Sequence, residues 1–198
     1  MTIEILIYDG VDELDVVGPF EVLSALAPRL VTLEPVPTIR SSHGLVLTPD
    51  GTLSDAPGVL VVPGGGWVAR DPGASCYGEY LRGAMPEAIA ARHARGTVVA
   101  GVCTGGMLLA KAGILDGRPA VTHRAALDEM GGHGVDLRPG ARWVDDGDVL
   151  TAGGVTSGID LALHLLERLS GPEAARAEER RLEHQRLDAA GSWATAAS

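Results

Sequence analysis

Cysteine is scarce in this chain of 198 residues, which has only Cys76 and Cys103, without C-x-x-C spacing. This scarcity argues against a disulfide framework and a structural zinc site, so we expect the protein in the reducing cytoplasm. No apolar run reaches about 18 residues, and the first residues have no basic segment before an apolar stretch. We therefore expect neither a transmembrane helix nor a signal peptide.

Basic residues are also few: the chain has 16 lysines and arginines against 26 aspartates and glutamates, which gives a formal net charge of −10. This balance argues against nucleic acid and against an anionic membrane as partners. A hydrophobic fraction of 45% and the chain length are typical of one soluble globular domain. We place that domain at residues 1–190 and expect residues 191–198 to form a frayed tail.

The most informative segment runs from residue 96 to residue 110. A run rich in β-branched residues at 97–102 predicts a buried strand, and good helix formers follow Thr104. Cys103 lies at the switch, within the G-x-C-x-G spacing of a nucleophile elbow. A helix N-terminus favours a thiolate, so we predict a reactive Cys103 with a lowered pKa. The alternative is a buried cysteine that acts as a small hydrophobic residue.

A glycine run supplies a second candidate part of the site. It follows the buried strand predicted at 59–62, and the backbone N–H groups of Gly64 and Gly65 are a candidate oxyanion hole or anion-binding nest. The alternative is a flexible turn.

Two titratable residues complete the candidate set. Asp15 has apolar neighbours after the first predicted strand, so it is either an acid–base group or a charge at a helix N-terminus. His123 leaves a short predicted strand and is expected close to the elbow, as a catalytic or a structural histidine. The other histidines share no metal-ligand spacing, and we predict no metal site.

The order of predicted elements indicates an α/β fold. Strands are predicted at 3–8, 30–39, 45–47, 59–62, 97–102 and 120–124, with a hairpin at 143–151. Pro19 is expected in the first turn of a helix, Ser157-x-x-Asp160 resembles a capping box, and Pro172 begins a last helix that ends near Gly191. Alternating strands and helices predict a sandwich with a mostly parallel central sheet and a site at the carboxyl edge of its strands.

Several motifs together resemble the ThiJ/PfpI superfamily, which is related to class I glutamine amidotransferases. The motifs are Val61–Gly65, Gly101–Gly105, Thr151–Gly154 and Ser157–Asp160, and the resemblance spans residues 3 to 169. It implies a flavodoxin-like three-layer sandwich and a homodimer. Protease-like members carry His directly after the nucleophile, where this chain has Thr104, so peptidase activity is not expected.

Within this superfamily, three segments are similar to the isonitrile hydratases: Leu14–Pro19, Cys103–Gly105 and Ala120–His123. The similarity implies that a small-molecule isonitrile is hydrated to an N-substituted formamide. Cys103 would form a thioimidate and Asp15 would act as general acid. Thr104 would hydrogen-bond the sulfur or a bound intermediate, and its N–H and that of Gly65 would polarise the substrate. No metal or organic cofactor is implied.

Two alternatives come from the same resemblance. The protein could be a non-catalytic redox or stress sensor in which Cys103 is oxidised. It could also be an amidotransferase-like regulatory protein, because AraC-type regulators carry the same motifs. Turnover of an alkyl isonitrile distinguishes the enzyme from the sensor.

Overall fold

The structure, a computed structural model, describes residues 1–191, so the predicted tail lies outside the described residues except for Gly191. The strands are β1 (Ile3–Leu6), β2 (Arg29–Thr32), β3 (Ile39–Arg40), β4 (Val46–Leu47), β5 (Gly51–Thr52), β6 (Val59–Val62), β7 (Val98–Val102), β8 (Pro119–Ala120), β9 (Asp136–Leu137), β10 (Trp143–Asp145) and β11 (Val149–Ala152). The α-helices are α1 (Glu13–Val22), α2 (Cys76–Arg82), α3 (Ala84–His93), α4 (Gly105–Lys111), α5 (Leu127–Gly131), α6 (Ser157–Ser170) and α7 (Pro172–Leu182). Short 3₁₀ helices are η1 (Ser24–Leu26) and η2 (Arg124–Ala126).

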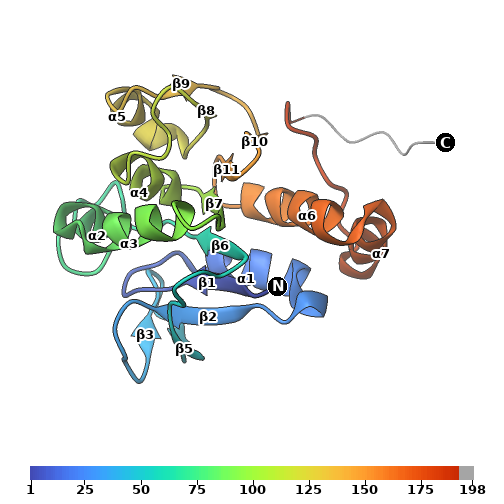
Figure 1. The fold of residues 1–198 in the computed structure, drawn as a ribbon, viewed down its shortest axis with the longest axis horizontal. Coiled ribbons are helices and arrows are strands. Elements are labelled where there is room, and N and C mark those ends of the chain that lie inside the picture. Colours follow the sequence, from blue (N-terminus) through green and yellow to red (C-terminus); the bar gives the residue numbers. More distant parts are fainter. Residues whose placement is uncertain (192–198) are drawn as a thin grey trace.

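The central sheet has the strand order β10-β11-β7-β6-β1-β2-β5, in which β10 alone is antiparallel to its neighbour. From β1 the chain moves toward one edge of the sheet, and from β6 it moves toward the other. Right-handed crossovers therefore place α1 on one face and α2 to α4 on the opposite face. Helix α6 packs against α1 and α7 (Figure 1). The result is the predicted three-layer, flavodoxin-like sandwich.

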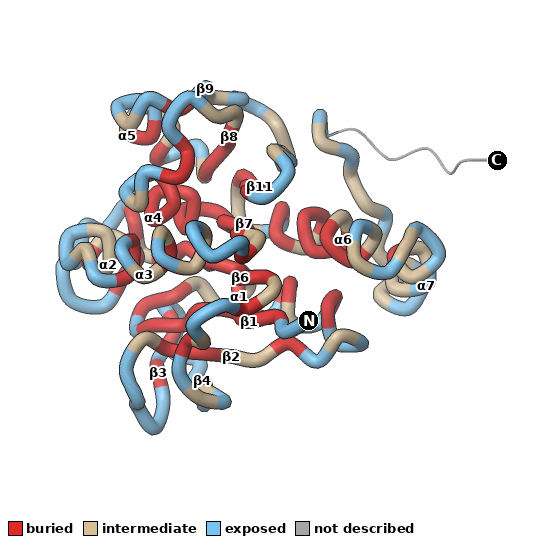
Figure 2. Tube along the Cα trace, viewed as in Figure 1, coloured by how far each residue is buried: buried red, intermediate tan, exposed pale blue. Residues whose placement is uncertain are grey.

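The core lies along the middle of this sheet. Strands β1, β6 and β11 are buried along their whole length, as Figure 2 shows for the centre of the molecule. Helices on both faces exclude water from these strands, which explains why apolar residues dominate them. The exceptions, Glu4 in β1 and Thr151 in β11, are buried and hydrogen-bonded. Within residues 1–191, no helix combines the length and the apolar character needed to cross a membrane.

Two predictions for the first third of the chain are wrong in detail. Pro19 lies inside α1 rather than in its first turn, because the helix begins earlier, where the Asp12 carboxylate accepts the Leu14 N–H at 3.0 Å. The strand predicted at 30–39 ends at Thr32. A connection with two prolines follows, and residues 39–40 pair with β4 in a separate two-stranded sheet.

Three further differences lie in the second half. The capping box is absent, because Ser157 is the first residue of α6 and its N-cap Thr156 makes no side-chain hydrogen bond. The strand predicted at 120–124 shortens to β8, which pairs with β9 outside the central sheet. Helix α7 begins at Pro172 as predicted but ends at Leu182, where Glu183 takes a left-handed conformation with φ of 50°. The hairpin at 143–151 is confirmed.

Candidate active site

Cys103 occupies the turn between β7 and α4 and has a backbone φ of 54°. This left-handed conformation costs a non-glycine residue about 1–2 kcal/mol, so neighbouring groups must hold it. The Cys103 N–H donates to the Ala152 carbonyl at 3.1 Å, and the Thr122 hydroxyl donates to the Cys103 carbonyl at 2.8 Å. A Cβ on Gly105 would lie 1.9 Å from the Val62 carbonyl oxygen. The predicted elbow and its requirement for glycine are confirmed.

Asp15 lies in the first turn of α1, after β1, and is completely buried. Its Oδ2 accepts the Gly64 N–H at 3.0 Å, and its Oδ1 has no hydrogen-bond partner among the described residues. Burial raises the pKa of Asp15 to about 8, and the charge of Asp12 adds to this effect. The Gly64 N–H and the Cys103 thiol act against it by stabilising the carboxylate. Asp15 therefore holds a proton near neutral pH.

The thiol of Cys103 does not have the predicted low pKa. Burial raises the pKa of Cys103 well above its ordinary value, and the charge of Asp15 raises it further. The Thr104 N–H, at the start of α4, favours the thiolate but is outweighed. The prediction failed because the sequence indicated a helix N-terminus beside Cys103 but did not indicate how deeply the thiol is buried, and burial is the larger effect on its pKa. Carboxyl and thiol thus share a site that disfavours negative charge on either.

The glycine run lies against the elbow, and its N–H groups are already engaged. Gly64 donates to Asp15, and the Gly65 N–H donates to the Thr104 hydroxyl at 3.1 Å. Each position needs glycine, because a Cβ on Gly64 would lie 2.4 Å from Thr104 Oγ1, and one on Gly65 would lie 2.4 Å from the Asp12 nitrogen. In this arrangement the two N–H groups position Asp15 and Thr104. The prediction of N–H donors that face a substrate therefore does not match the hydrogen bonds of Gly64 and Gly65.

His123 comes to the same edge of the sheet but packs beside Gly154, whose added Cβ would lie 3.6 Å from the ring. Its Nδ1 accepts the Ala125 N–H at 3.2 Å. Burial lowers the pKa of His123, and the charge of Arg124 lowers it further. The imidazole is therefore neutral near pH 7, with its proton on Nε2. No hydrogen bond joins it to Cys103 within residues 1–191.

Sequence reasoning did not find two groups that support the elbow. Thr122 holds the Cys103 carbonyl, and the only signal for it was its place beside His123. Cys76 is fully buried, and its thiol donates to the Thr104 carbonyl at 3.2 Å. Burial raises the pKa of Cys76 to about 12, so its role is structural.

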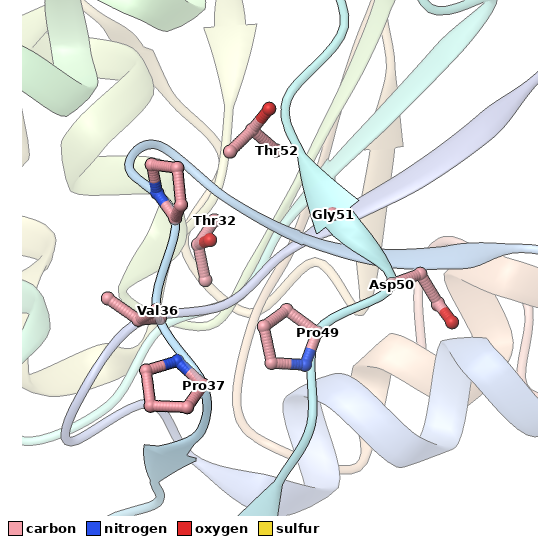
Figure 3. A pocket seen from close by; sticks show the side chains of 8 residues that line it. Thr32, Val36, Pro37, Pro49, Asp50, Gly51 and Thr52 are labelled. Carbon is pink, nitrogen blue, oxygen red and sulfur yellow. The ribbon is translucent and has the colours of Figure 1, made fainter.

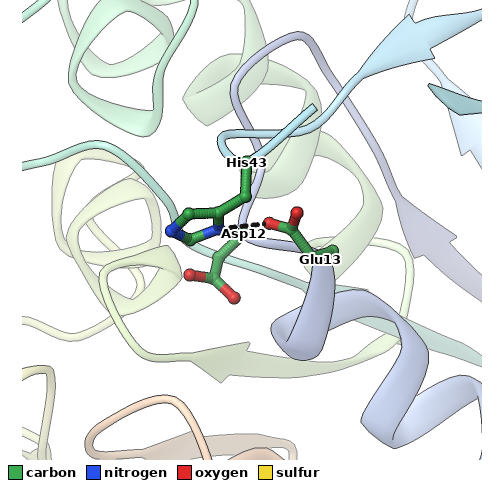
Figure 4. A group of neighbouring side chains, drawn as sticks. All are labelled: Asp12, Glu13 and His43. Carbon is green, nitrogen blue, oxygen red and sulfur yellow. Dashed lines mark hydrogen bonds and ion pairs between the residues drawn. The ribbon is translucent and has the colours of Figure 1, made fainter. Parts of the chain in front are cut away.

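The residues that could hold a metal ion are Asp12, Glu13 and His43, whose ligand atoms lie within 4.8 Å of one another (Figure 4). His43 is largely exposed, and its Nδ1 lies 2.8 Å from Glu13 Oε2. Asp12 caps α1. Glu13 also accepts hydrogen bonds from two serine hydroxyls. These contacts account for the cluster as the hydrogen-bonded start of α1.

The hollows in the described part of the chain include two that differ in their place relative to the elbow. One, of about 320 Å³, lies at the β2–β5 edge of the sheet, far from the elbow, and its walls include Val36, Pro37 and Pro49 (Figure 3). The other, of about 350 Å³, is lined by His123, Arg124, Arg142, Gly154, Val155 and Thr156. His123 and Gly154 bring this second hollow toward the elbow, because they follow Thr122 and Ala152, which hydrogen-bond to the backbone of Cys103.

A three-layer α/β sandwich with a cysteine elbow and a buried carboxyl beside the thiol defines a class of cysteine-centred flavodoxin-like proteins. The DJ-1/PfpI family model matches residues 1–168, and the chain belongs to this family.

Three similar proteins illustrate the range of the family. The chain is 36% identical to isonitrile hydratase of Pseudomonas putida over 189 residues, covering 93% of this chain and 78% of the relative. It is 27% identical to the Parkinson disease protein 7 homolog of Danio rerio, covering 86% of this chain and 90% of that relative. A ThiJ/PfpI family protein from Pseudomonas syringae superposes with a TM-score of 0.81 at 27% identity, over 92% of this chain and 74% of that one.

Proposed function

We propose that this protein hydrates an organic isonitrile to the N-substituted formamide, with Cys103 as nucleophile and Asp15 as general acid. The observation that carries the proposal is the buried Asp15 carboxyl, protonated near neutral pH, beside the Cys103 thiol. An isonitrile carbon becomes a good electrophile when it is protonated, so a neutral acid and a neutral thiol suit this substrate. The similarity to isonitrile hydratase supports the same reaction.

In the first half-reaction the S–H bond adds across the isonitrile carbon. Asp15 gives its proton to that carbon, and the Cys103 sulfur bonds to the same carbon as the thiol proton passes to the Asp15 carboxylate. The product is a thioimidate, R–N=CH–S–Cys103, and Asp15 is again protonated. Neither group needs to carry a lasting negative charge, which the buried site disfavours.

In the second half-reaction water adds to the thioimidate carbon. Asp15 relays a proton from the water to the nitrogen, and the Cys103 sulfur leaves and recovers its proton. The net reaction adds one water to R–NC and releases R–NH–CHO. Thr104 holds the sulfur through its N–H, and its hydroxyl is kept in place by Gly65.

The experiment is to incubate the purified chain with a simple alkyl isonitrile and to measure formamide by mass spectrometry. We expect turnover by the wild-type protein and none by Cys103→Ala. Quenching during turnover should reveal an adduct with the mass of the isonitrile on the peptide that contains Cys103, and none on Cys76. Absence of formamide, with peroxide adding two oxygens to Cys103, would reject the proposal in favour of the sensor.

A further inference from the structure

Two residues that line the second hollow, His123 and Gly154, follow closely after groups that hydrogen-bond to the backbone of Cys103. His123 follows Thr122, whose hydroxyl holds the Cys103 carbonyl, and Gly154 lies two residues after Ala152, which accepts the Cys103 N–H. The hollow is therefore lined by residues that lie one or two positions after the groups holding the elbow backbone.

The charge of this hollow is unusual for a chain with a net charge of −10. Two arginines line it, Arg124 and Arg142. Arg142 is fixed, because its Nε donates to the buried Asp160 at 2.6 Å and its Nη2 donates to Thr156 Oγ1 at 3.0 Å. Asp160 offsets the charge of Arg142, so Arg142 mainly shapes the wall.

Arg124 differs from most arginines of the chain. Its side chain has no ion pair and no hydrogen bond within residues 1–191, and its charge lowers the pKa of its neighbour His123. The charge of Asp12 has the opposite effect and raises the pKa of His123. An arginine without a carboxylate partner, at the rim of a hollow next to a nucleophile, has its guanidinium donors available for a ligand.

We propose that this hollow binds a carboxylate on the substrate through Arg124, with Arg142 shaping its wall, while the reacting group reaches Cys103. Resting on the proposed function, the inference narrows the substrate class to isonitriles that carry a carboxylate a few bonds from the isonitrile carbon. An arginine binds a planar carboxylate in a two-pronged geometry, which would also orient the substrate for attack.

The first test compares isocyanoacetate with its methyl ester, which has the same isonitrile group and no charge. We expect the wild-type protein to have the higher kcat/KM for the acid. In Arg124→Gln the ratio of kcat/KM for acid and ester should fall about tenfold, the scale of one lost hydrogen bond to a charged group. Arg180→Gln is the matched control, because Arg180 is also exposed and lies on α7, away from the hollow. That variant should keep the wild-type ratio.

A binding measurement separates this inference from the proposed reaction. N-formylglycine, the product expected from isocyanoacetate, is titrated calorimetrically into the wild-type protein and into Arg124→Gln, with its methyl ester as the neutral probe. Binding of the acid that weakens about tenfold in Arg124→Gln would support the hollow even if no isonitrile were turned over. An acid-to-ester ratio that is the same in wild type and Arg124→Gln, in turnover and in binding, would overturn the inference and leave the hydration reaction standing.

Discussion

At the scale of single residues, the proposed chemistry depends on where one proton lies between Asp15 and Cys103. Desolvation is the largest cause of the raised pKa on both groups, and each would repel a negative charge on the other. Sequence left two roles open for Asp15, an acid–base group or a charge at a helix N-terminus. Asp15 lies in the first turn of α1, but Asp12 supplies the cap, and the pKa of about 8 leaves Asp15 uncharged near neutral pH. A carboxyl buried without a capping task is a costly feature, and the proposed role as general acid would account for it.

The substitution Asp15→Asn keeps the shape and removes the titrating proton. We expect isonitrile turnover to fall by about 10²-fold or more, the scale of lost acid–base assistance. Above pH 8 the wild-type carboxylate raises the pKa of Cys103, so iodoacetamide should label Cys103 faster in Asp15→Asn than in the wild type. Site mapping by mass spectrometry checks this, with the deeply buried Cys76 as internal control. Unchanged turnover and labelling would remove Asp15 from the mechanism.

The raised pKa of Asp15 also makes stability depend on pH. The ordinary pKa of 3.8 applies to the unfolded chain, and the folded value is about 8. Between these values the unfolded state has released the proton that the folded state keeps, so rising pH favours unfolding. The free energy of unfolding of the wild type, relative to that of Asp15→Asn, should fall by up to about 1.4 kcal/mol per pH unit in this window. Urea unfolding of both proteins at pH 5, 6, 7 and 8 tests this, and parallel profiles would contradict it.

At the scale of elements, the site is a close contact between a loop and a turn. The glycine run after β6 packs against the elbow and the start of α1 so tightly that side chains are excluded. This contact carries the hydrogen bonds from Gly64 to Asp15 and from Gly65 to Thr104. The loop therefore acts as a rigid support for the acid and the elbow.

The substitution Gly105→Ala tests how rigid this contact is. The new methyl group would meet the Val62 carbonyl oxygen, which belongs to the backbone of a central strand and cannot move aside. We expect the free energy of unfolding to fall by about 2 kcal/mol or more, as for other overpacked sites. Gly153→Ala is the control, because its nearest atom would be 3.4 Å away and the cost should be small. Equal urea midpoints for the two variants would show that the backbone at the elbow relaxes to accept the methyl group, and would contradict the prediction.

At the scale of the whole molecule, strand order assembles the site. Strands β1, β6 and β7 are consecutive neighbours in a parallel sheet, and the segments after them carry Asp15, the glycine run and Cys103. Carboxyl ends of parallel strands meet at one edge, so three segments far apart in sequence come into contact there.

We propose that two copies of the chain form a homodimer in solution. The support is the family resemblance, together with α7, of which only Ala175 is buried. Light scattering should therefore give twice the chain mass of 20.4 kDa. A mass of one chain that does not change over a hundredfold range of protein concentration would reject the dimer.

The sequence by itself determined the parts of this protein that depend on local pattern. The apolar runs identified the central strands, and the G-x-C-x-G spacing located the elbow, because these features arise from the residues next to one another in the chain. The sequence motifs also identified the family, which the family model confirms. Local pattern misjudged Pro19, because a capping aspartate upstream decided where α1 begins.

Only the tertiary structure decided the protonation states of Asp15 and Cys103. Whether Cys103 is a thiolate depends on how much water reaches it and on how near Asp15 lies, and neither quantity is encoded in local spacing. The partners of the Gly64 and Gly65 N–H groups and the unpaired Arg124 became visible only when the segments were brought together. Burial and proximity are properties of the folded chain, and they set the pKa values on which the chemistry depends.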